Sequence, residues 1–116
     1  MTSGMKTVIY PVKDIAAAKA LFSQLLGVEP HTDQPYYVGF SIGDQEVALD
    51  PNGHSQGMTG TVGYWHVDDI EKSLQMLVEA GAKKQQAIRN VGGGKLTAIV
   101  TDPDGNVIGL LQSPTG

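Results

Sequence analysis

The segment PVKDI at residues 11–15 recurs in a related form, HVDDI, at residues 66–70. In each copy an aspartate precedes a stretch whose apolar residues have helical spacing. An aspartate in this position can accept hydrogen bonds from the free N–H groups of the first helical turn, and its charge opposes the helix dipole. The two segments therefore predict helices over residues 14–26 and 69–80.

The two predicted helices also share the signals that begin and end a helix. In the second helix Asp68 is an alternative cap to Asp69, because Glu71 would then complete a capping box. Gly27 and Gly81 suit the left-handed turn that often ends a helix. We expect each helix to cover one face of a sheet with its apolar residues, which are Ile15, Ala18, Leu21, Phe22 and Leu25 in the first helix and Ile70, Leu74, Leu77 and Val78 in the second.

Short strand patterns lie on both sides of each helix, bounded by residues that favour turns. The sequence predicts a strand before each helix and three after it. These strands are residues 7–10, 28–31, 36–42 and 45–50 in the first half and residues 61–67, 84–88, 95–101 and 107–111 in the second. Hairpin turns are expected at residues 43–44 and 102–105, and a glycine-rich linker at residues 51–60.

The predicted order is β-α-β-β-β, repeated once, which is an α+β architecture. A ferredoxin-like β-α-β-β-α-β domain is the competing interpretation. That fold leaves too few places for the two clear strands that follow the second helix. We therefore expect two tandem βαβββ modules, each with its helix on one face of a sheet.

The composition limits the partners of the chain. It has 116 residues, 8 Lys plus Arg against 12 Asp plus Glu, a net charge of -4 and 41% hydrophobic residues, which predicts a single folded domain. Arg89 is the sole arginine, so we expect no nucleic-acid partner. No apolar stretch approaches the roughly 18 residues of a membrane span. No leader pattern or cysteine is present, and we expect a cytoplasmic protein without disulfides or thiolate metal sites.

Four motifs in order carry a resemblance to a known family: residues 11–15 (PVKDI), 25–27 (LLG), 67–70 (VDDI) and 102–106 (DPDGN). Together they resemble the vicinal oxygen chelate superfamily, which includes lactoylglutathione lyases, bleomycin-resistance proteins, fosfomycin-modifying enzymes and extradiol dioxygenases. The resemblance spans residues 5–113. It implies a single glyoxalase-like domain of two βαβββ modules, about 5–52 and 60–113, whose curved mixed sheets form a cup, usually within a homodimer.

The resemblance also implies where a divalent metal would be held in the metalloenzymes of the family. Its four ligand positions, on the first and last strands of each module, fall on Thr7, Asp50 (within one residue), Val62 and Gly109. Only Asp50 is an ordinary metal ligand, because valine and glycine side chains offer no donor atom. We therefore expect no cofactor, and a divalent metal is disfavoured.

Strand alternation identifies the residues that share the cup face with these four positions. Tyr64 and His66 offer an aromatic surface and a titratable group, and with Asp50 and Thr7 they are the predicted ligand-binding residues. Each has a structural alternative: Tyr64 as packing, His66 as a strand-end histidine bonded to backbone or water, and Asp50 as the start of a turn. The apolar neighbours expected on the same face are Ile9, Ala48, Val107 and Leu111.

Other conspicuous residues have structural interpretations. Trp65 is expected to point toward a helix and to lie in the core. His31 and His54 lie in turn-rich segments without metal-ligand spacing, and solvated loop histidines are expected there. The glycine run at residues 92–94 before Lys95 lacks the Ser or Thr and the following helix of a phosphate-binding loop, and a flexible loop near the cup mouth is expected.

Three functions remain compatible with the sequence. The favoured one is a metal-free, dimeric protein that binds a small organic molecule in its cup. The alternative is a metal-dependent lyase, isomerase or dioxygenase of the same superfamily, with Asp50 and His66 in an unorthodox ligand set. The third is metal-free acid–base catalysis, in which His66 transfers a proton and Tyr64 polarises a carbonyl group.

Overall fold

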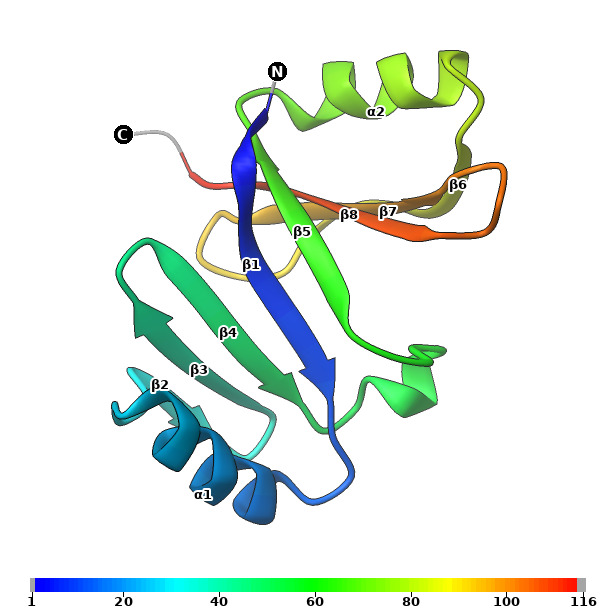
Figure 1. The fold of residues 1–116 in the computed structure, drawn as a ribbon. Helices are drawn as coiled ribbons and strands as arrows, with labels where there is room; N and C mark the ends of the chain where they lie inside the picture. Colours follow the sequence, from blue (N-terminus) through cyan, green and yellow to red (C-terminus); the bar gives the residue numbers. More distant parts are fainter. Residues whose placement is uncertain (1, 115–116) are drawn as a thin grey trace. The chain divides into compact units, whose positions relative to one another are not determined.

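A computed structural model describes residues 2–114 of the protein and contains the predicted βαβββ order twice (Figure 1). The ferredoxin-like order is therefore wrong. The first copy consists of β1 (Thr2–Pro11), α1 (Ile15–Leu26), β2 (Thr32–Gln34), β3 (Tyr37–Ile42) and β4 (Gln45–Asp50). The second consists of β5 (Val62–Val67), α2 (Ile70–Glu79), β6 (Lys83–Asn90), β7 (Leu96–Thr101) and β8 (Val107–Gln112). A short 3-10 helix, His54–Gln56, lies in the predicted linker.

The chain divides into two compact units. The first unit is Lys6–Val62, and the second unit combines Met1–Met5 with Gly63–Gly116. Strand β1 therefore contributes its first residues to the second unit and its remaining residues to the first. Each unit has its own helix and its own hydrophobic cluster.

The sheet of the first unit has the strand order β2-β3-β4-β1. Strand β1 pairs with β4 in parallel, with Thr7 opposite Glu46 and Pro11 opposite Asp50, while the other pairs are antiparallel. Helix α1 packs against β3 and β4. The buried side chains of this cluster are Val38, Phe40 and Leu49, and Tyr10, Ile15, Ala18, Phe22 and Leu26 pack against them.

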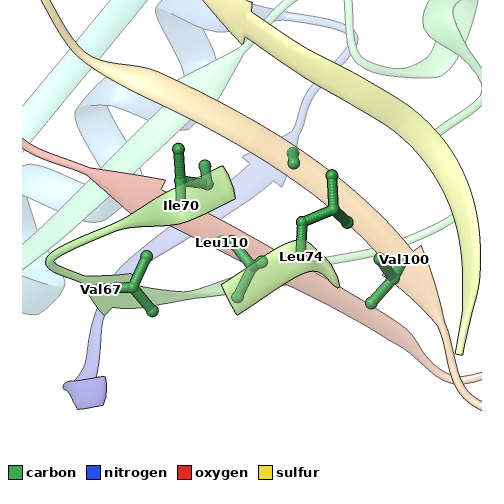
Figure 2. Packing of buried hydrophobic residues seen from close by; sticks show 6 residues of the cluster. Val67, Ile70, Leu74, Val100 and Leu110 are labelled. Atoms are coloured by element: carbon green, nitrogen blue, oxygen red, sulfur yellow. The ribbon is translucent and has the colours of Figure 1, made fainter. Parts of the chain in front are cut away.

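The sheet of the second unit has the order β1-β5-β8-β7-β6. Strands β5 and β8 are parallel, and β6, β7 and β8 form an antiparallel meander. Figure 2 shows how Ile70 and Leu74 of α2 meet side chains from three strands. The complete buried cluster is Val67, Ile70, Leu74, Ala98, Val100 and Leu110.

Both predicted helix starts are present. A carboxylate oxygen of Asp14 accepts from the backbone N–H of Ala17 at 3.1 Å, and Asp69 accepts from that of Lys72 at 3.1 Å. The cap of α2 is therefore Asp69, and the alternative capping box that begins at Asp68 is wrong. Gly27 ends α1 in the left-handed region with φ 72°, as expected for a C-terminal glycine.

Several residues expected in the core are exposed. Leu21 and Leu25 of α1 are 61% and 69% exposed, because the residues that α1 turns toward the sheet are Ile15, Ala18, Phe22 and Leu26, and the two leucines flank that row. Val78 of α2 is exposed for the same reason. Trp65 pairs with the helix-side residue Leu110, so its predicted face is right, but it is 39% exposed and the expectation that it lies in the core is wrong.

Strand boundaries differ from expectation mainly at β1 and β2. Strand β1 begins at Thr2 rather than at residue 7. The strand predicted at residues 28–31 is wrong, because the pairing with β3 that defines β2 begins at Thr32, opposite Gly39, and covers only Thr32–Gln34. The turn at residues 102–105 is as predicted: Asp102 accepts from the backbone of Asp104 and Asn106, and hydrogen bonds, above all from the Asn106 side chain, lower the Asp102 pKa.

No helix within residues 2–114 is long and apolar enough to cross a membrane.

Candidate functional site

Each sheet has a face turned away from the helix of its unit, which we name the far face of that unit. In the first unit Leu49 and Val38 pack on the α1 side. Strand alternation therefore places Glu46, Ala48 and Asp50 of β4 on the far face, together with the partner of Glu46 on β1, Thr7. The sequence predicted Thr7, Ala48 and Asp50 on this face but did not identify Glu46.

Glu46 is the centre of a polar cluster on the first far face. His31 Nε2 lies 2.8 and 2.9 Å from the two Glu46 carboxylate oxygens, and the Tyr37 hydroxyl donates to Oε2 at 3.1 Å. The Ser41 hydroxyl donates to Oε1 at 3.3 Å. The other ring nitrogen of His31, Nδ1, lies 2.8 Å from Thr32 Oγ1. His31 lies in the bend before β2 and is exposed, as predicted, but the sequence did not predict its contacts with Glu46 and Thr32. His54 is also exposed as predicted.

Gly39 makes room for this cluster. A Cβ atom at position 39 would lie 2.8 Å from Glu46 Oε2, 2.9 Å from Tyr37 Cε1 and 3.1 Å from His31 Cε1. All three neighbours belong to the cluster, so any side chain at position 39 would displace at least one of its members. The glycine thus allows the carboxylate, the imidazole and the phenol to converge.

The surroundings of Tyr37 favour its neutral form. Burial raises the pKa of the Tyr37 hydroxyl most, and the charge of Glu46, its hydrogen bond and the charge of Asp50 raise it further above the ordinary value of 10.0. The folded protein therefore keeps the Tyr37 proton at a pH at which the unfolded chain has lost it. The stability contributed by this proton is complete below pH 10 and falls as the pH rises above it.

The variant Tyr37→Phe tests this contribution. At neutral pH we expect it to lower the free energy of unfolding by about 1–2 kcal/mol, because a donor to a carboxylate is lost. Above pH 10 the difference from the wild type should shrink, since only the wild type carries the titrating phenol. Urea denaturation between pH 7 and 11 measures this, with Tyr36→Phe, at an exposed position, as the control. A difference that does not change with pH would contradict the raised pKa.

Asp50 and Thr7 have clear structural roles. An Asp50 carboxylate oxygen accepts from the Asn52 backbone N–H at 2.8 Å, so the residue does begin a turn. Thr7 is buried, with 5% exposure. Both residues belong to the first unit, whereas Tyr64 and His66 belong to the second. That the four form one ligand site stays a prediction.

On the second far face the strand register aligns residues in two rows that cross four strands. The Tyr64 row runs from Tyr64 through Gly109 and Ile99 to Gln86. The His66 row runs from His66 through Leu111 and Thr97 to Arg89. Residues paired across strands project from the same face, so both rows lie opposite α2. Tyr64, Leu111 and Thr97 are buried, His66 is half-buried, and Arg89 at the β6 edge is exposed.

The Tyr64 ring covers Gly109. A Cβ atom at position 109 would lie 2.7 to 2.9 Å from three ring carbons, so the tyrosine occupies the space of any side chain there. Val62, the other ligand position that the family resemblance implies for the second module, is buried and apolar. These two positions do not fit a divalent metal, because neither supplies a donor and an aromatic ring fills the space at one of them.

The described residues contain no ready-made metal cluster. Within residues 2–114 no group of three or more His, Cys, Asp or Glu side chains is arranged to hold a metal ion. A shallow cleft of about 340 Å³ lies in the first unit beside the start of α1, where Lys19 and Asp33 form an ion pair at 2.9 Å. The hydroxyl of Thr2 donates to the backbone carbonyl of His66 at 2.7 Å.

The sequence analysis missed Glu46, Tyr37, Gln86 and Gly39. One signal was available for Glu46. Alternate residues of a strand share a face, and Glu46 continues the series that Asp50 and Ala48 begin. The convergence of His31 and Tyr37 on Glu46 depends on the pairing of β2, β3 and β4, which no local pattern specifies. The alignment of Gln86 depends on a bulge in β6, which is likewise invisible locally.

The chain is similar in sequence and in fold to proteins of one known superfamily. The sequence model of the Glyoxalase/Bleomycin resistance protein/Dioxygenase superfamily matches residues 4–110. A structure of a member of that superfamily from Vibrio splendidus 12B01 is 22% identical, with a TM-score of 0.70, and the alignment covers 93% of this chain and 97% of that one. Methylmalonyl-CoA epimerase from Mycobacterium tuberculosis is 14% identical, with a TM-score of 0.73 and coverage of 98% and 90%.

A third similar structure, the Mn(II)-bound glyoxalase from Novosphingobium aromaticivorans, is 22% identical with a TM-score of 0.69, and the alignment covers 96% of this chain and 39% of that one. At these identities the structural likeness shows the fold alone. A search of curated proteins gave no significant match.

Proposed function

Because the chain belongs to the glyoxalase/bleomycin resistance protein/dioxygenase superfamily, we propose that it binds a small organic molecule on its far faces without the metal of the family's metalloenzymes. Membership confirms the resemblance inferred from the four motifs. The observation that supports the proposal is the Tyr64 ring over Gly109, which fills with aromatic carbons the space that a side-chain metal donor would need at that position. Aromatic rings and a few polar groups are what small-molecule sites commonly offer.

The predicted ligand-binding residues are distributed in a way that suits this proposal. Tyr64 and His66 begin the two rows of the second far face, and Thr7 and Asp50 lie on the first far face. Beside Thr7, the Glu46 cluster adds a carboxylate already held by an imidazole and two hydroxyl groups. We further propose that the protein is a homodimer and that it is cytoplasmic. Light scattering on the purified protein measures its oligomeric state directly.

Metal content and ligand binding test the proposal together. Untagged protein, purified without chelator and offered Mn, Fe, Co, Ni and Zn, should hold much less than one ion per chain. In a thermal-shift screen of aromatic and aliphatic small molecules, at least one compound should raise the melting temperature by mass action. The shift should diminish in Tyr64→Ala and His66→Ala. One tightly bound ion per chain, with no response to any organic compound, would overturn the proposal.

The second candidate function is a metal-dependent lyase, isomerase or dioxygenase with an unorthodox ligand set. The observation that favours it is the contact between His31 and Glu46, because an imidazole nitrogen and a carboxylate are ordinary metal donors. If a metal binds, the ligand set of this candidate includes either that pair or the predicted Asp50 and His66. Two double variants separate these ligand sets, because only the variant that removes the true ligands should lose affinity for the metal. One combines His31→Ala with Glu46→Ala, and the other combines Asp50→Ala with His66→Ala.

A further inference from the structure

The side of α1 that points away from its sheet carries no charged residue. Helix α1 packs against β3 and β4, and six residues on its other side are exposed. We name these six the outer face of α1: Ala16, Ala17, Ala20, Leu21, Gln24 and Leu25. A helix on the surface of a soluble protein typically has charged and polar residues on this side. The outer face instead presents two leucines that are 61% and 69% exposed.

The second module provides an internal comparison. The repeat that aligns residues 11–15 with residues 66–70 also aligns the outer face of α1 with six exposed positions on α2 and at its C-terminal end. Three of those six residues are charged. They are Glu71, Lys72, Gln75, Met76, Glu79 and Ala80. The two helices have the same place in their modules, so the fold does not require an uncharged outer face. Such a surface is typical of a site that another protein covers.

The outer face of α1 is complementary in shape to a second copy of itself. Its exposed residues within 16–20 are all alanines, and those within 21–25 are two leucines and a glutamine. When two such helices pack antiparallel about a two-fold axis, the alanine half of each lies opposite the larger half of the other. The large side chains then fill the space that the small ones leave. Parallel packing would place alanine opposite alanine and leave a gap.

The charges on and next to α1 fit the same arrangement. Lys13, before the helix, and Glu29, after it, are exposed and form no ion pair with any residue between 2 and 114. In an antiparallel pair the start of each helix lies beside the end of the other, so each Lys13 comes near the partner's Glu29, with opposite charge. The other charges are engaged within the chain: Asp14 caps α1, and Lys19 pairs with Asp33 at 2.9 Å.

We propose that the outer face of α1 is the contact surface of a homodimer, in which α1 of one copy packs antiparallel on α1 of the other about a two-fold axis. This inference rests on the proposed homodimer and identifies its surface. Leu21 lies near the axis, because it is close to the middle of the outer face. Six residues on each copy are few beside the roughly 20–30 residues a side of a standard interface. We therefore expect a dimer that dissociates on dilution.

Sedimentation velocity over a range of protein concentrations tests the surface. The wild type should pass from monomer to dimer as the concentration rises. Leu21→Glu should raise the dimer dissociation constant at least tenfold, because it brings two like charges together near the axis. The matched control is Met76→Glu, which adds the same charge at the corresponding position of α2, where Met76 is 52% exposed. It should change the dissociation constant less than threefold. Circular dichroism verifies that both variants are folded.

Disulfide formation tests the orientation, because the chain has no cysteine of its own. Under mild oxidation Leu21→Cys should form a covalent dimer, since its two copies lie near the axis. Ala17→Cys alone should not, whereas a mixture of Ala17→Cys and Gln24→Cys should form a mixed dimer. Met76→Cys measures the rate of chance encounters. If Ala17→Cys alone forms covalent dimer as fast as Leu21→Cys, the helices are parallel and the inference fails.

The outcomes separate this inference from the proposed homodimer. If the wild type dimerises and Leu21→Glu has the same dissociation constant, the dimer uses another surface, so the inference is overturned and the homodimer stands. Equal weakening by Leu21→Glu and Met76→Glu would also overturn the inference, because added charge alone would then explain the effect. If the wild type stays monomeric at every concentration up to about 1 mM, both the homodimer and its surface are overturned.

Discussion

Replacement of Gly109 by alanine is expected to lower the free energy of unfolding by about 2 kcal/mol, although it adds a single methyl group. The added carbon would lie 2.7 Å from Tyr64 Cδ2 and 2.9 Å from two other ring atoms. Tyr64 is 7% exposed, so its ring cannot move aside freely. Urea denaturation of the purified variant measures the loss.

Two further variants identify the cause of this loss. Gly60→Ala is the control, because no atom lies within 4 Å of a Cβ at that position and its φ is not positive, and it should stay within about 0.5 kcal/mol of the wild type. In the background of Tyr64→Ala, Gly109→Ala should be nearly neutral, since the ring it meets is gone. Full stability of Gly109→Ala in the wild-type background would mean that space for a donor exists at position 109, and the metal-dependent candidate would then lead.

The second large effect is expected for Glu46→Ala, which should lower the free energy of unfolding by about 2 kcal/mol. The change removes the shared acceptor of His31, Tyr37 and Ser41. The part-buried Tyr37 hydroxyl then loses its acceptor, whereas the exposed His31 and Ser41 can bond to water. Glu29→Ala, at an exposed position, is the matched control and should change stability by less than about 0.5 kcal/mol. Chemical denaturation at pH 7 measures both variants.

Glu46→Gln separates the roles of charge and of hydrogen bonding in this cluster. It keeps an acceptor oxygen of similar size but loses the charge, so an intermediate loss of stability is expected. Once Glu46 is alanine, Tyr37→Phe should cost little more, because the two residues act through the same bond. Additive losses in the double variant would show that Tyr37 stabilises the fold independently of Glu46.

The sequence predicted the elements of the fold well where the signal is local. Asp14, Asp69 and Gly27 mark helix ends by backbone chemistry that a few neighbouring residues decide, and the structure has all three in those roles. Strand β4 has the predicted bounds, Gln45–Asp50. Strand β2 was misplaced because three residues at a sheet edge are defined by their partners in β3 and not by their own composition.

The candidate site was harder to predict because its parts meet through tertiary pairing. The helical periodicity predicted that Leu21 and Leu25 lie in the core, but both are exposed. The apolar face of α1 is wider than the row of residues that contacts the sheet, so periodicity alone does not identify that row. His31 is exposed in a turn-rich segment, as predicted, but the local sequence does not reveal that its ring contacts a carboxylate from β4. The cover of Gly109 by Tyr64 depends on the register of two strands far apart in the chain.

In each module the first and last strands along the chain pair in parallel, and this pairing affects the order of folding. Thr7 meets Glu46, and Tyr64 meets Gly109, only after a helix and two further strands have been crossed. Closing such long loops is entropically unfavourable, whereas the hairpins β3–β4 and β7–β8 bring near neighbours together. We expect the hairpins and helices to form first and β1 and β5 to dock last. Because this late closure is the unfavourable step, the Tyr64 contact with Gly109 belongs to the folding barrier, and its loss should slow folding more than it accelerates unfolding.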